Sequence, residues 1–110
     1  MGPAKKKLPK AYLGMKERYG GVMEAVEELG EALKDAGPLD EKTAQLVQLA
    51  AAAAIRSEGS VHSHVRRALE AGAKPEEIRH ALVLLTSTIG FPTVAASMTW
   101  AGDIMGKPRK

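Results

Sequence analysis

The chain has no cysteine among its 110 residues. This absence excludes mechanisms that need a thiolate nucleophile, thiol peroxidation among them, because a serine hydroxyl cannot pass through sulfenic acid. Aromatic residues are scarce, with one Phe, one Trp and two Tyr, although hydrophobic residues make up 45% of the chain. The core must therefore consist mainly of Leu, Val, Ile, Ala and Met. That composition favours packed helices over a β-sandwich.

The sequence also lacks a long apolar run and a recognisable secretory signal. Its longest apolar segment, from Leu46 to Ile55, is interrupted by Gln48 and is too short to cross a bilayer. We therefore expect no membrane partner. A cytoplasmic location is the default expectation.

The net charge of +3 is concentrated at the two ends of the chain. Seven of the 16 basic residues lie there, namely Lys5, Lys6, Lys7, Lys10, Lys107, Arg109 and Lys110. Without these seven, nine basic residues remain against 13 acidic ones, so the body of the protein is acidic. Basic ends are typical of solvated chain termini, whereas a nucleic-acid surface gathers its charge on one ordered face. We predict no nucleic-acid partner.

Periodicity and turn signals predict one helical domain over residues 11–106, between a flexible basic lead at 1–10 and a basic tail at 107–110. Val22, Val26, Leu29 and Leu33 recur at helical spacing and predict an amphipathic helix over 21–36. The domain should contain five or six helices. The others are expected near 11–19, 40–56, 57–71, 75–90 and from 92 onward.

Several residues mark where these helices begin and end. Asp40 is placed to accept hydrogen bonds from the free amides of a first turn, and Pro75 suits the first position of a helix. Gly72 suits a left-handed helix end. The helix over 40–56 is nearly apolar all round at Ala50 to Ala54, which predicts burial against neighbouring helices or partner subunits.

The segment from Arg56 to Gly72 holds the densest set of reactive side chains. If it is helical, Ser57, Ser60 and His64 share one face, and His62 lies elsewhere on the helix. His64 is a candidate general acid or base. The two serines are more typical of helix caps than of nucleophiles, because no third group is evident that would orient the imidazole.

The pattern Ser57-x-x-Ser60-x-x-x-His64, followed by Val65 to Ala73, resembles the carboxymuconolactone decarboxylase and AhpD-like (alkylhydroperoxidase) superfamily over about residues 20 to 105. Its peroxidase branch carries Cys-x-x-Cys-x-x-x-His and a glutamate in the preceding helix. Here both cysteine positions are serine and the glutamate position is Gln45, so peroxidase activity is not expected. The resemblance implies an all-α AhpD-like domain. Together with the small size and the alanine-rich helix, it implies a ring-like homo-oligomer, a trimer or a hexamer.

The decarboxylase branch needs no cysteine. The resemblance implies cofactor-free loss of carbon dioxide from a carboxylated unsaturated lactone, with histidine as the proton donor. Those decarboxylases carry a second histidine and an acid where this chain has Gly59 and Ser60, which leaves the substrate open. We predict a small-molecule enzyme of the lyase or isomerase type, acting on an anionic lactone or oxo acid. The alternative is a non-catalytic ligand-binding or assembly module with the family fold.

We therefore expect His64 to be catalytic and Ser57, Ser60, Gln45 and Arg67 to bind the substrate. Gln45 can hydrogen-bond His64 or the substrate, and Arg67 can pair with an anion.

No metal and no other cofactor is expected. His62 and His64 lie two residues apart on a helix and point in different directions, so they cannot easily join His80 around one ion. Glu58 is expected to face solvent.

Overall fold

The computed structural model describes residues 9–106, so most of the predicted basic lead and the whole tail at 107–110 lie outside it. The described chain contains seven helical segments and no strand. One of these, α6 (Thr86–Ile89), is a single turn, which leaves six longer helices and confirms the predicted all-α fold. No helix in this part of the chain is both long and apolar enough to cross a membrane.

The chain divides into two compact units at the bond between Pro38 and Leu39. The first unit contains α1 (Lys10–Arg18) and α2 (Gly20–Asp35). The second contains all the remaining helices. The single domain over 11–106 stays a prediction.

Glu27 on α2 joins the two helices of the first unit. Its carboxylate accepts a hydrogen bond from the Tyr12 hydroxyl and lies 3.2 Å from the Lys16 ammonium. That ammonium also lies over the Tyr12 ring, 5.8 Å from its centroid. The break between the two helices falls at Tyr19 alone, so α2 begins at Gly20, one residue before the predicted start at 21.

The apolar stripe of α2 is uncovered. The predicted amphipathic helix is present, but its four apolar residues, Val22, Val26, Leu29 and Leu33, are each more than half exposed. None of the described residues of this unit is buried. Isolated helices of this length are only marginally stable in water.

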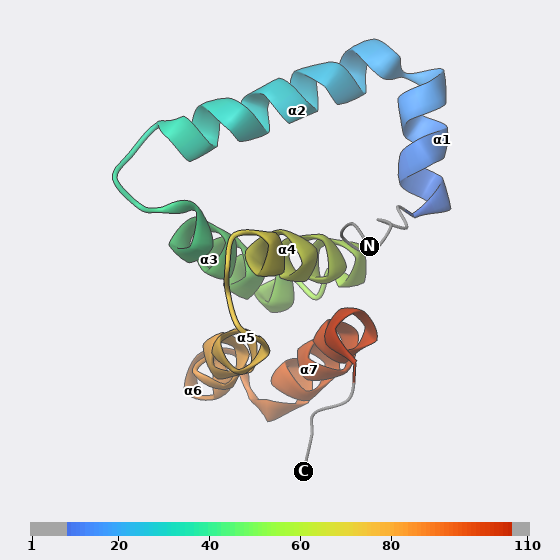
Figure 1. The fold of residues 1–110 in the computed structure, drawn as a ribbon. Coiled ribbons are helices and arrows are strands. Elements are labelled where there is room, and N and C mark those ends of the chain that lie inside the picture. Colours follow the sequence, from blue (N-terminus) through green and yellow to red (C-terminus); the bar gives the residue numbers. More distant parts are fainter. Residues whose placement is uncertain (1–8, 107–110) are drawn as a thin grey trace. The chain divides into compact units, whose positions relative to one another are not determined.

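The second unit is built on a hairpin of α3 (Glu41–Ala54) and α4 (Glu58–Glu70), which lie side by side in Figure 1. Helices α5 (Pro75–Val83) and α7 (Phe91–Met105) pack against this pair. Small side chains let the helices approach closely, and larger aliphatic ones fill the space between them. The buried core consists of Leu49, Ala52, Ala53, Val61, Val65, Ala68, Ala73, Ile78, Leu82 and Ala101.

The predicted helix ends are confirmed on both sides of this hairpin. A side-chain oxygen of Asp40 accepts from the Thr43 amide at 2.8 Å, as expected of an N-cap. At the end of α4, Gly72 adopts a φ of 100°. The amides of Gly72 and Ala73 then donate to the carbonyls of Leu69 and Ala68, which is a Schellman motif.

One expectation about these helices needs correction, and another is tested only in part. Neighbouring helices cover the alanine-rich helix on one side, since Leu49 is fully buried whereas Val47 is 55% and Ile55 74% exposed, and burial against partner subunits stays a prediction. The helix predicted over 75–90 is divided, because hydrogen bonding changes at Leu85, whose amide donates to the carbonyl of Leu82 three residues before it. The following helix, α7, begins at Phe91 after Gly90, which has a φ of 90°.

Candidate functional site

A three-residue link from Ile55 to Ser57 brings α3 and α4 together. Its middle residue, Arg56, has a φ of 57°, a left-handed conformation that costs a non-glycine residue roughly 1 kcal/mol or more. The Arg56 guanidinium donates to the Thr93 hydroxyl on α7 at 2.9 Å, which holds the link in place. The turn is therefore tight enough to return the chain directly along α3.

Ser57 lies outside the helix that carries His64. Helix α4 begins at Glu58, and Ser57 has the extended backbone of an N-cap. Its Oγ accepts a hydrogen bond from the Ser60 amide at 3.4 Å, so the predicted capping role is confirmed. Only Ser60 and His64, one turn apart, share a side of α4. Within the described chain, no hydrogen bond joins His64 to either serine.

Gln45 and His64 form the central polar contact of the hairpin. His64 Nδ1 lies 2.8 Å from Gln45 Oε1, as expected if the amide meets the imidazole. The two residues stand ten and nine positions from Ile55, so an antiparallel hairpin places them opposite each other. Gln45 is buried, and His64 is partly buried.

This contact determines which nitrogen of His64 is available. An amide oxygen can only accept, so Nδ1 carries the proton and donates it to Gln45. In neutral imidazole the other nitrogen, Nε2, then holds a free lone pair. Within the part of the chain that the structure describes, Nε2 has no hydrogen-bond partner, and His64 as a whole is partly exposed.

Burial lowers the pKa of His64 below its ordinary value, and the positive charge of Arg67 lowers it further. Gln45 is neutral, so it does not favour the imidazolium as a carboxylate at the same place would. Both effects favour the neutral imidazole over the charged form of His64. Arg67, three residues along α4, is exposed.

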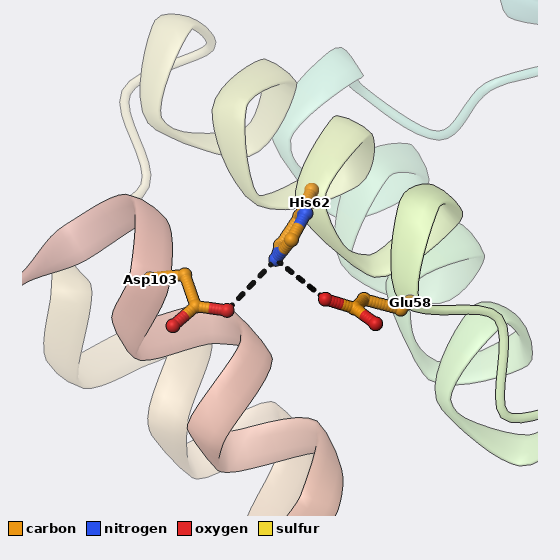
Figure 2. Close-up of side chains that lie close together, drawn as sticks. All are labelled: Glu58, His62 and Asp103. Atoms are coloured by element: carbon orange, nitrogen blue, oxygen red, sulfur yellow. Dashed lines mark hydrogen bonds and ion pairs between the residues drawn. The ribbon is translucent and has the colours of Figure 1, made fainter. Parts of the chain in front are cut away.

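The other histidine of α4 belongs to a different cluster. His62 Nε2 lies 3.0 Å from Asp103 Oδ2 on α7 and 4.0 Å from Glu58 Oε2 (Figure 2). The expectation that His62 and His64 point in different directions is confirmed, and His80 is exposed on α5.

Sequence reasoning missed this second cluster. The spacing of four residues between Glu58 and His62 was a usable signal, because such residues are neighbours on a helix. Asp103, 41 residues beyond His62, gave none, because only the packing of α7 against α4 brings it close.

The family model described as "Carboxymuconolactone decarboxylase family" matches residues 20–103, which is more than half of the chain. The chain belongs to the carboxymuconolactone decarboxylase family. The resemblance carried by Ser57, Ser60 and His64 is thereby confirmed. Searches of curated proteins and of solved structures found no match.

The first prediction separates the two serines of this family member. Ser57→Ala should lower the free energy of unfolding by about 1 kcal/mol, because it removes the side-chain cap of α4. Ser60→Ala is the matched control and should cost less than about 0.5 kcal/mol, because Ser60 contributes its backbone amide to the cap and keeps it. Denaturant unfolding measures both. Equal losses in the two variants would contradict the capping role.

The second prediction concerns acid sensitivity. Because the pKa of His64 is lower in the folded chain than in the unfolded one, the unfolded chain binds the proton more readily. The free energy of unfolding should therefore fall as the pH drops below about 6.5, until the lower folded pKa is passed. His64→Gln should make this fall shallower. Denaturant melts from pH 7.5 to 5, in buffer containing EDTA, measure it, and identical slopes in the two proteins would contradict the lowered pKa.

Proposed function

We propose that this protein is a cofactor-free enzyme in which His64 transfers a proton to and from a small anionic substrate. The observation that supports this most is the hydrogen bond from His64 Nδ1 to Gln45, which leaves the lone pair of Nε2 available to a substrate. A neutral imidazole with a free, oriented nitrogen is suited to general base catalysis. Family membership and the absence of cysteine agree with a reaction that uses no thiol.

The proposed reaction begins with proton abstraction. Nε2 takes a proton from a carbon next to a carbonyl group, the C–H bond breaks, and its electron pair moves into the carbonyl system as an enolate. The resulting imidazolium keeps its Nδ1–H bond to Gln45. It can then return the proton to another carbon of the conjugated system, which isomerises the substrate without any oxidant or reductant.

A lyase reaction uses the same nitrogen in the opposite sense. Carbon dioxide leaves when the carbon–carbon bond breaks, and an imidazolium then gives its Nε2 proton to the dienolate that remains. This order requires the charged form at the start, which the lowered pKa of His64 makes less populated at neutral pH. The isomerase type is therefore the better supported of the two.

The positions of the residues predicted to bind the substrate suggest what each of them does. We assign Gln45 a positioning role, because its buried amide holds the imidazole. We place Ser60 and Arg67 beside the substrate, since both lie within one turn of His64 on α4 and Arg67 adds positive charge for a carboxylate. Ser57 contributes through the start of α4 that it caps, and its hydroxyl hydrogen remains able to contact the substrate.

A cytoplasmic homo-oligomer, trimeric or hexameric, is part of this proposal. Large apolar side chains of the second unit are exposed in the single chain, including Ile55 at 74%, Phe91 at 67% and Leu84 at 63%. Burial of such side chains between subunits is favourable. Light scattering tests this point, and a mass of 11.7 kDa, that of one chain, would contradict it.

A non-catalytic ligand-binding or assembly module is the second candidate. It is favoured by Gln45 at the position where the peroxidase branch carries glutamate, because an amide cannot relay protons. In this candidate His64 would only hydrogen-bond a ligand.

Exchange of carbon-bound hydrogens of the substrate with solvent deuterium distinguishes the enzyme from the binding module. Lactones, 3-oxo acids and dicarboxylates are incubated with the protein in D₂O, and loss of carbon-bound proton signals is followed by NMR. We expect the wild type to accelerate exchange for one class and His64→Gln to lose this activity. His80→Gln, which removes a histidine from another helix, is the matched control and should keep it.

The melting temperature of the protein in the same mixtures shows whether a compound binds without being turned over. A ligand present at about 100 times its dissociation constant stabilises the fold by roughly 2.7 kcal/mol. Stabilisation that depends on His64 without any exchange would favour the binding module. Neither stabilisation nor exchange with any class would contradict the proposed enzyme.

A further inference from the structure

We propose that Glu58, His62 and Asp103 form a binding site for a divalent transition-metal ion of the Zn²⁺ class. The three side chains meet where α4 packs against α7, with His62 between the two carboxylates (Figure 2). Each offers one ligand atom, and these atoms all lie within 4.8 Å of one another. The proposal departs from the expectation of no metal stated above, because two of these three ligands are carboxylates and only one is a histidine.

The placement of the ligands follows from the two helices. Glu58 and His62 are four residues apart and therefore project from the same side of α4. Asp103 lies in the last turn of α7 and approaches from the opposite side. The backbone of two packed helices thus sets the spacing of the ligands, and only side-chain torsions need to adjust.

The distances suit a small cation. Zinc binds imidazole nitrogen and carboxylate oxygen at about 2.0 to 2.2 Å, so ligand atoms around it stand about 3 to 4 Å apart. The measured separations from His62 Nε2 are 3.0 Å to Asp103 and 4.0 Å to Glu58. The side chains of Asp103 and Glu58 are 49% and 58% exposed, so both carboxylates are free to close on an ion.

The donor set selects the class of metal. One imidazole and two carboxylates suit Zn²⁺ and its first-row neighbours, whereas Ca²⁺ and Mg²⁺ prefer sites made entirely of oxygen. With neutral His62 the three groups carry two negative charges, which a divalent ion neutralises. Exposure of the carboxylates leaves further coordination positions to water.

This site is independent of the proposed function. Two positions along a helix correspond to a rotation of about 200°, so His62 and His64 project from nearly opposite sides of α4. Their partners differ accordingly, Asp103 on α7 for one and Gln45 on α3 for the other. A bound ion would join α4 to α7 and stabilise the second unit, because it binds the folded chain only.

Calorimetric titration of untagged, EDTA-treated and desalted full-length protein with Zn²⁺ tests the proposal. We expect one ion to bind per chain, and Asp103→Asn and His62→Gln each to weaken binding at least about tenfold. His80→Gln is the matched control, since it removes an exposed histidine outside the cluster, and it should bind Zn²⁺ as the wild type does.

Thermal unfolding with and without Zn²⁺ guards against variants that fold poorly. Zn²⁺ should raise the melting temperature of the wild type and of His80→Gln, and the same Zn²⁺ concentration should raise that of His62→Gln by less. Circular dichroism confirms that each variant is helical before titration. Failure of the wild type to bind Zn²⁺, or unchanged binding by folded Asp103→Asn, would overturn the proposal.

Discussion

The packing of α3 against α4 is the constraint on which the rest of the second unit depends. Buried alanines at 52 and 53 on α3 and at 68 on α4 keep these helices slim enough for close packing in the core. The short link around Arg56 fixes which residues stand opposite each other. The contact between Gln45 and His64 follows from that register, and a shift by one residue would separate them. Helix packing thus brings Gln45 and His64 together, and their hydrogen bond then orients the imidazole.

This chain lacks the reactive groups of the family's peroxidase branch. Serine in place of cysteine removes the thiolate, and Gln45 in place of glutamate removes a charge that would stabilise imidazolium. What remains is one partly buried histidine, whose Nδ1 lies 2.8 Å from Gln45 Oε1. In the function proposed above this histidine is a base, and such a reaction requires neither a thiol nor a reductant.

Local sequence signals were sufficient for most of the fold. Asp40 starts α3 and Gly72 ends α4 through contacts within a few residues. The apolar stripe of α2 repeats at helical spacing. Both helix boundaries and the amphipathic helix were therefore predictable. The extent of burial was not, because apolar composition does not reveal which sides of a helix find neighbours. Ile55 lies in an almost continuous apolar run and is nevertheless 74% exposed.

The candidate site was predictable to a similar degree. The motif identified His64, and the family's glutamate position identified Gln45, so their pairing could be anticipated. The cluster around His62 could not be, because Asp103 reaches it only through the packing of α7 on α4. Residues distant in sequence whose contact depends on tertiary packing carry no local pattern.

The hydrogen bond between Gln45 and His64 is tested most directly by ¹⁵N NMR of His64 in the wild type and in Gln45→Glu, titrated in the presence of EDTA. We expect neutral His64 in the wild type to carry its proton on Nδ1 and to have a pKa below that of an unperturbed histidine. Gln45→Glu should raise its pKa, because a carboxylate stabilises the imidazolium. A proton on Nε2 in the wild type, or a pKa that does not change in Gln45→Glu, would contradict the central role of this hydrogen bond.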